Sequence, residues 1–264
     1  LDVTEFDERL RTRNFSRSAS CLITFDDAWR DNHTHAFPIL KRLGTPAVIF
    51  VPTDYIGTGR LFWQERLGHL VQTVCRRSTD TAEKILKPYG WEYLATLASA
   101  AQAREIRSVI RAIKHKDYPE IERMITDLEQ ALGDTQPDYG PDIYLAIDQM
   151  REMQPNGISF QSHGCTHRVL TRLSLQEVRK EMQDSRRWLT EHLETEPVAH
   201  AYPNGDHDPT VAECCAQSGY RMAFTTVYGD VMPDSDPYTI RRINVNDNAA
   251  PNAARLLLNL YLSG

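Results

Sequence analysis

The chain has 264 residues, which is enough for one large domain with a complete core or for two small domains. Hydrophobic residues make up 41% and charged residues 25%, as in an ordinary soluble globular protein. The net charge of −6, without a block of Lys or Arg, argues against a nucleic-acid partner. No apolar run reaches the length of a membrane span, about 18 residues, so we expect no span.

Short apolar runs alternate with helical patterns along much of the chain. We predict strands at residues 21–25, 47–51, 158–161, 198–202, 220–226 and 238–245. A helix is predicted over 174–193, with a capping box at its start and a stripe formed by Leu175, Val178, Met182, Ser185, Leu189 and Leu193. Another helix begins at Asp208-Pro209 and ends at Gly219. Strands that alternate with helices predict parallel βα units and an α/β fold.

Residues 60–150 interrupt this alternation. They carry helical patterns at 61–74, 93–113 and 119–132, with Gly133 as a stop signal, and residues 142–153 lead into the next strand. We find no strand pattern here and predict a helical insertion at a loop of the α/β fold, where it would be placed to shape a substrate groove. Near the other end, residues 253–262 are apolar on one side and predict a closing amphipathic helix.

Two carboxylates, Asp26 and Asp27, stand side by side where the first strand leaves the core. Like charges at this separation repel each other unless they share a cation. The pair suits a site in which one carboxylate binds a metal and the other accepts a proton. It also suits an ordinary helix N-cap, and this segment alone leaves both interpretations open.

Two histidines follow a second strand far along the chain. His163 and His167 have three residues between them, so both imidazoles can reach one cation, although an isolated pair of this kind often arises by chance. Polar groups at the ends of two separate strands are harder to attribute to chance, because strand ends are where ligands gather in α/β sheets and barrels.

With these motifs the sequence resembles the NodB-like polysaccharide deacetylases. Thr24-Phe25-Asp26-Asp27 matches the first motif of that family, Ser162, His163 and His167 match the second, and Pro203-Asn204-Gly205 loosely matches the third. The resemblance covers about two thirds of the chain and leaves residues 60–150 outside. It implies a single deacetylase domain over 1–264, with a distorted (β/α) barrel and the helical insertion.

The resemblance also implies a site. The metal ligands would be Asp27, His163 and His167, with zinc as the first expectation and nickel, cobalt or iron as other divalent ions that fit these ligands. Asp26 would be the general base, and the backbone N–H of Asn204 would stabilise the oxyanion. Many members carry an Arg where this chain has Ala201; we expect Arg242, on the last strand, to supply that guanidinium instead.

The general acid is the second departure from the family. Many members have a late histidine in this role, whereas no histidine follows His207 here. His200 and His207 are nearby candidates. The chain begins at Leu1 without Met, and residues 1–10 resemble the segment that follows a histidine-bearing strand in exopolysaccharide-associated members. We therefore expect a natural N-terminus that extends further and carries the acid.

The resulting hypothesis is metal-dependent hydrolysis of N-acetyl groups on a bacterial polysaccharide or glycolipid. One alternative is hydrolysis of a small amide or formamide. Another is a pseudoenzyme that binds metal or carbohydrate, but the intact Asp26 argues against it, because a site that only binds does not need a second carboxylate. The five cysteines form a poor disulfide framework and are predicted to be free thiols. The sequence gives a preference for the cytoplasm and no indication of oligomeric state. Four aromatic side chains could either stack on a sugar or pack in the core or a loop: Trp29, Tyr55, Trp63 and Tyr202.

Overall fold

A computed structural model of the chain describes residues 1–15, 20–133 and 143–245. The chain divides into two compact units, Leu1–Thr58 with Pro141–Gly264 and Gly59–Gly140, which are described separately below. The amphipathic helix predicted at 253–262 lies outside the described residues.

The first unit is built on a sheet of six parallel strands whose order in the sheet follows the chain. All six predicted strands are present. The first and the last are shorter than predicted, with β6 limited to Ile240–Arg242. In the first, only two residues enter the ladder, and Ile23 contributes one further bond, its carbonyl accepting from the Val48 N–H. The strands are β1 (Thr24–Phe25), β2 (Ala47–Val51), β3 (Ile158–Ser162), β4 (Ala199–Ala201), β5 (Met222–Tyr228) and β6 (Ile240–Arg242).

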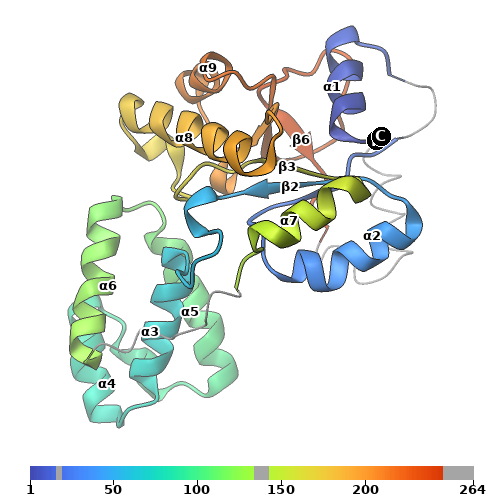
Figure 1. The fold of residues 1–264 in the computed structure, drawn as a ribbon. Coiled ribbons are helices and arrows are strands. Elements are labelled where there is room, and N and C mark those ends of the chain that lie inside the picture. Colours follow the sequence, from blue (N-terminus) through green and yellow to red (C-terminus); the bar gives the residue numbers. More distant parts are fainter. Residues whose placement is uncertain (16–19, 134–142, 246–264) are drawn as a thin grey trace. The chain divides into compact units, whose positions relative to one another are not determined.

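Helices surround this sheet and confirm the predicted alternation. In Figure 1, α2 and α7 lie on one side of β2 and β3, and α8 and α9 lie on the other. The segment that leads into β3 forms α7 and belongs to the first unit, outside the compact helical unit. The helices are α1 (Val3–Thr12), α2 (Phe37–Leu43), α7 (Ile147–Met153), α8 (Leu175–Leu193) and α9 (Pro209–Gln217). Short helical segments of the unit are η1 (Asn32–Ala36), η2 (Thr53–Tyr55), η5 (Gln154–Asn156), η6 (Leu170–Arg172) and η7 (Pro203–Gly205).

The inner face of the sheet is closed by α1. Alternate residues of the strands point to one face, and the apolar side of α1 packs against them. The Phe6 ring of α1, for example, lies 5.8 Å from the Phe224 ring of β5. The sheet curls around this cluster and brings its two edge strands together: the guanidinium of Arg242 in β6 lies 3.4 Å from the Thr24 hydroxyl of β1. The cluster contains Val3, Phe6, Leu10, Val48, Phe50, Ala199, Ala201, Met222, Phe224 and Ile240.

The second unit is helical and has its own core. Buried apolar residues from the four α-helices described over 59–133 form one cluster, so the unit buries hydrophobic surface internally. Arg66 of α3 bridges to Glu122 and Glu129 of α6 and ties the first helix to the last. Gly133 ends α6 as predicted, whereas α4 was not identified from the sequence. The elements are α3 (Trp63–Cys75), α4 (Thr79–Leu86), η3 (Lys87–Tyr89), η4 (Glu92–Thr96), α5 (Ser99–Ile113) and α6 (Tyr118–Leu132).

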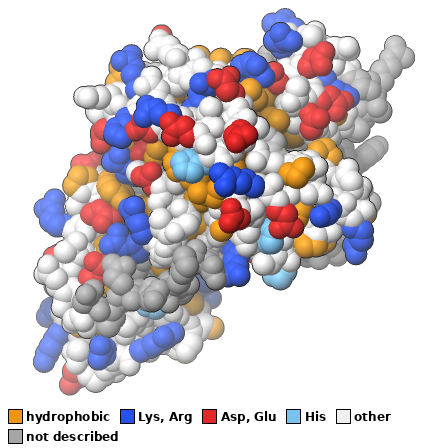
Figure 2. Space-filling model, viewed as in Figure 1, with side chains coloured by type: hydrophobic (Ala, Val, Ile, Leu, Met, Phe, Trp, Pro, Cys, Tyr) orange, Lys and Arg blue, Asp and Glu red, His pale blue; other side chains and the backbone are white. Residues whose placement is uncertain are grey.

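The surface bears charges of both signs. On the face shown in Figure 2, Lys and Arg side chains are interspersed with Asp and Glu, in keeping with the modest net charge of −6. Within the described ranges, no helix has the length and apolar character needed to cross a membrane. All five cysteines are free, as predicted.

The long helix α8 begins with the predicted capping box. The Ser174 hydroxyl accepts from the Glu177 N–H at 3.3 Å, and the Glu177 carboxylate accepts from the Ser174 N–H at 2.9 Å. The predicted apolar stripe is buried except for Leu175, which is 42% exposed because it lies in the first turn, before the helix passes over the sheet. Glu181, which is not part of the predicted stripe, is buried as well.

Ser174→Ala is expected to lower the free energy of unfolding by about 0.5–2 kcal/mol, because it removes one half of the capping box. Chemical denaturation measures the change. Gln176→Ala is the matched control, since Gln176 is exposed in the same turn. Equal stability of the two variants would contradict the role of the capping box.

Candidate active site

Polar residues at the ends of four strands lie along the carboxyl edge of the sheet. Asp26 and Asp27 follow β1, and His163 follows β3 directly. Asn204 lies in η7, just after β4, and Arg242 is the last residue of β6. Because the strands are parallel, their carboxyl ends share one edge, where ligands collect in such folds.

Asp27, His163 and His167 form a group that could hold a metal ion. One donor atom from each lies within 4.8 Å of the others. The Asp27 Oδ1 atom lies 3.5 Å from His163 Nε2 and 3.2 Å from His167 Nε2. Among the described residues this buried oxygen accepts no hydrogen bond of good geometry. Two imidazole nitrogens around a buried carboxylate oxygen that lacks a hydrogen bond are a donor set that fits a divalent transition metal.

Other contacts orient these side chains. His163 Nδ1 lies 2.7 Å from the Ala201 carbonyl oxygen, which can only accept, so Nδ1 carries a proton and Nε2 is the ring nitrogen that faces Asp27. The Trp29 indole N–H donates to Asp27 Oδ2 at 3.2 Å and leaves Oδ1 for a cation. The Trp29 ring is itself stacked on Tyr144, with centroids 4.9 Å apart. Trp29, which the sequence suggested as a sugar platform, thus holds a carboxylate in place, an arrangement typical of the surroundings of metal ligands.

Asp26 is paired with Arg242. The guanidinium donates to both carboxylate oxygens, at 2.8 and 2.9 Å, and the Arg242 Nε donates to the Thr225 carbonyl at 2.8 Å. The two side chains are 15% (Arg242) and 30% (Asp26) exposed, so the pair is partly shielded from water. A bidentate pair of this kind fixes the orientation of a carboxylate as well as its charge. The structure therefore brings Arg242 to the carboxylate expected to act as base, and Arg241 remains exposed.

Electrostatics keep both carboxylates ionised. Burial acts to raise the pKa of Asp26, but the charge of His163 and the bonds from Arg242 outweigh it, and the pKa lies below its usual range. Burial likewise opposes the effect of His163 and His167 on Asp27, whose pKa is nevertheless well below its usual range. Burial acts to lower the pKa of His163, whereas Asp27 and Asp26 raise it, with a net increase. Both carboxylates thus remain ionised beside the two histidines, as a metal ligand and a proton acceptor must be.

The third motif makes a tight turn beside this site. Asn204 has φ 62° and its carbonyl accepts from the Thr226 hydroxyl at 3.1 Å. Gly205 follows with φ 79°, and a Cβ there would lie 2.1 Å from Thr226 Oγ1. A glycine is therefore required for the turn to approach β5 so closely.

Unusual backbone conformations gather at these motifs. Asp27 has φ 72°, Ala28 φ 53°, His167 φ 55° and Asn204 φ 62°. The other non-glycine residues with positive φ among those described, Arg13 and Glu194, are ordinary helix C-caps. Positive φ in a non-glycine residue costs free energy and persists where surrounding contacts impose it, which is frequent in active sites.

The candidate acids lie beside the site in different environments. His200 is buried, its Nδ1 lies 3.0 Å from the Ser162 hydroxyl, and burial followed by the charge of His163 lowers its pKa to about 3. It is therefore neutral at pH 7. His207 is partly buried, stacks on Tyr202 at 5.2 Å and donates from Nδ1 to the Gly205 carbonyl. Tyr202 is fully buried and bonds the Tyr238 carbonyl, so it is not a sugar platform.

Comparison with known proteins identifies the family. Residues 15–223 match the polysaccharide deacetylases. Since this match covers most of the chain, the chain belongs to the polysaccharide deacetylase family of hydrolases, as the sequence motifs predicted. The Bacillus subtilis (strain 168) protein "Putative polysaccharide deacetylase YxkH" is 24% identical over 243 residues, which cover 92% of this chain and 57% of that protein. The chain thus spans little more than half the length of this relative.

Solved structures confirm the predicted barrel fold. The Streptococcus pyogenes deacetylase PplD in complex with acetate has a TM-score of 0.61 at 22% identity, over 98% of this chain and 78% of that one. IcaB from Ammonifex degensii has a TM-score of 0.62 at 16% identity, over 100% of this chain and 82% of that one. At these identities the likeness shows the fold alone.

The ligand set predicts a loss of metal on substitution. His163→Ala and His167→Ala are each expected to retain little divalent metal, because two donors hold an ion far more weakly than three. Elemental analysis of untagged protein should find about one metal per chain without substitution. His115→Ala is the control, since His115 is exposed in the helical unit. Full metal content in both site variants would exclude this ligand set.

Proposed function

We propose that the protein hydrolyses N-acetyl groups on a bacterial polysaccharide or glycolipid and releases acetate. The observation that carries the proposal is the convergence of Asp27, His163 and His167 beside a carboxylate, Asp26, that is fixed by Arg242. A metal site beside a separate ionised carboxylate has the two parts that amide hydrolysis by water requires.

Asp27, His163 and His167 would hold one divalent transition metal, with zinc as the first expectation and nickel, cobalt or iron as alternatives. The bound ion would polarise the amide carbonyl and lower the pKa of the attacking water. Asp26, ionised and oriented by Arg242, would accept the proton of that water. The Asn204 N–H, in the turn fixed by Gly205, would donate to the oxygen that becomes negative.

Membership of the family supports a carbohydrate substrate, and the helical unit adds a second argument. An insertion of this size between β2 and β3 extends a loop that leaves the carboxyl end of β2, the end where barrels bind their substrates. A large insertion in that connection favours a polymer or lipid-linked glycan over a small amide. The test is to measure hydrolysis of N-acetylated glycans, acetyl esters and small formamides, by release of acetate or formate. Turnover of formamides alone would overturn the proposal of a carbohydrate substrate.

We also infer that the chain forms a single deacetylase domain with the helical unit inserted into it. The family match at 15–223 begins before Gly59–Gly140 and ends after it, which supports one domain with an insertion rather than two joined end to end.

Asp26→Asn is expected to reduce turnover of an N-acetylated glycan by about 10²–10⁴-fold, a typical share for general acid–base catalysis. The amide keeps the shape of the side chain but cannot take a proton from water. Metal content should remain that of the unsubstituted protein, because Asp26 is not among the three ligands. Near-normal turnover would place the base elsewhere.

Arg242→Lys should also lower kcat, because a lysine cannot donate two parallel hydrogen bonds to Asp26 or keep the bond to the Thr225 carbonyl. Arg241→Lys is a matched control, since this neighbouring Arg is exposed and makes no contact with Asp26 in the structure. Steady-state kinetics on both variants measure the difference. If both variants retained the same kcat, Arg242 would have no role in positioning the base.

A further inference from the structure

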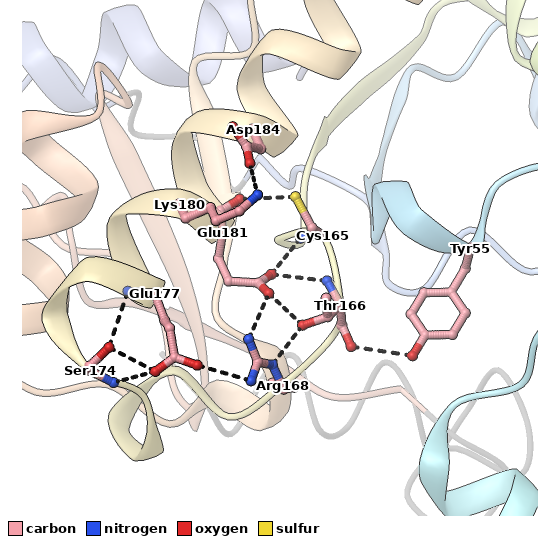
Figure 3. A network of polar contacts seen from close by, with 9 residues as sticks. All are labelled: Tyr55, Cys165, Thr166, Arg168, Ser174, Glu177, Lys180, Glu181 and Asp184. Atoms are coloured by element: carbon pink, nitrogen blue, oxygen red, sulfur yellow. Dashed lines mark hydrogen bonds and ion pairs between the residues drawn. The ribbon is translucent and has the colours of Figure 1, made fainter. Parts of the chain in front are cut away.

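A carboxylate is buried on the apolar side of α8. Glu181 occupies the stripe that packs toward the sheet, between Val178 and Met182, and its side chain is 5% exposed. A buried charge on an apolar helix face costs free energy unless hydrogen bonds compensate it. Glu181 is therefore expected to have a specific partner, and Figure 3 shows that its partners lie in the loop between the two histidine ligands.

The Glu181 carboxylate binds the middle of that loop. Oε2 accepts from the backbone N–H of Cys165 at 2.7 Å and of Thr166 at 2.9 Å, and Oε1 accepts from the Thr166 hydroxyl at 2.5 Å. These two residues stand between His163 and His167 in the sequence. Arg168, just after the second histidine, lies 3.6 Å from Oε1 and offsets part of the charge.

The carbonyl groups of the same loop are bound from the other side. The N–H groups of Thr53 and Asp54 donate to the carbonyls of Gly164 and Cys165, each at 3.1 Å. The Tyr55 hydroxyl donates to the Thr166 carbonyl at 3.3 Å. All three are in η2, directly after β2. The backbone N–H groups of Gly164, Cys165 and Thr166 are thus all bound by side chains: that of Gly164 donates to the Ser162 hydroxyl, and the other two donate to Glu181. The carbonyl groups of the same three residues accept hydrogen bonds from η2.

The fit around the carboxylate is close. Gly164 has φ 75°, and a Cβ there would lie 3.1 Å from Glu181 Oε2. Any larger residue would press on the carboxylate that binds the next two N–H groups. The loop ends at His167, whose φ of 55° is unfavourable and needs external contacts to persist.

We propose that Glu181 is a positioning residue that holds the loop 163–167 in the conformation in which both imidazoles reach one metal ion. The inference rests on the proposed metal site. Two backbone N–H groups and a hydroxyl donate to one carboxylate, and removing it leaves these donors without an acceptor. The loop would then change conformation, and the Nε2 atoms of His163 and His167 would no longer be placed to bind the same ion. The Glu181 carboxylate contacts Cys165, Thr166 and Arg168 rather than the imidazoles, so it acts through the loop.

The test is metal affinity, measured with Co²⁺ and Zn²⁺ alone on metal-free protein. Glu181→Met removes the acceptors and should weaken Co²⁺ binding by about 10–100-fold, with a changed visible spectrum of the bound ion. Glu181→Gln keeps one oxygen for the two N–H groups and a donor for the Thr166 hydroxyl, so affinity should stay within about threefold. A role in stability alone would lower the melting temperature and leave both affinity and spectrum of the folded protein unchanged.

Glu177→Gln is the matched control, because Glu177 lies one turn earlier on α8 and contacts Ser174 and Arg168 but not the loop between the histidines. Should Glu181→Met not fold, Thr166→Val removes one of the three bonds and should weaken Co²⁺ binding by about 3–10-fold. Unchanged affinity and spectrum in the folded Glu181 or Thr166 variant would overturn the inference. Failure of the unsubstituted protein to bind either ion would instead overturn the proposed function on which it rests.

Discussion

The hydrogen bonds between Arg242 and Asp26 join the last strand of the sheet to the first. No ladder between β1 and β6 is formed by the described residues, so the sheet is a curled, open barrel rather than a closed one. The apolar cluster under α1 supports the curl from inside, and the guanidinium spans the remaining gap at the carboxyl edge. Without the curl, Asp26 would stand beside Asp27 without the guanidinium that fixes its orientation.

This constraint explains how much of the site could be predicted from the sequence. Strands end at the same edge of a parallel sheet, so polar motifs that follow apolar runs identify the members of a site even when more than a hundred residues separate them. Arg242 was expected because the family resemblance required a guanidinium that Ala201 cannot supply, and the structure shows why it serves: the curl of the sheet brings the last strand back to the first. The family resemblance supplied the expected roles, which sequence periodicity alone does not provide.

Other features could not be predicted from the sequence, because they depend on contacts between distant residues or on very short elements. Trp29 was predicted only as a residue that could stack on a sugar, since its bond to Asp27 depends on the positive φ of Asp27 and on the stack with Tyr144, far along the chain. Glu181 has a signal, a charge at a position three residues after Val178 on an apolar face, but its partners follow from tertiary packing. The helix α4 is short and was missed because eight residues give little periodicity to detect.

The division into two units has a consequence for the order of folding. Ala47 of β2 pairs with Ile158 of β3, so the central pairing of the sheet must close a very long loop, and the entropy lost on closure grows with loop length. The helical unit lies within that loop, and its first and last long helices are tied together by Arg66. Local helical contacts form faster than distant strand pairs. Early folding of the helical unit would therefore shorten the stretch of flexible chain between β2 and β3, and a substitution that unfolds it should slow assembly of the sheet without touching a strand.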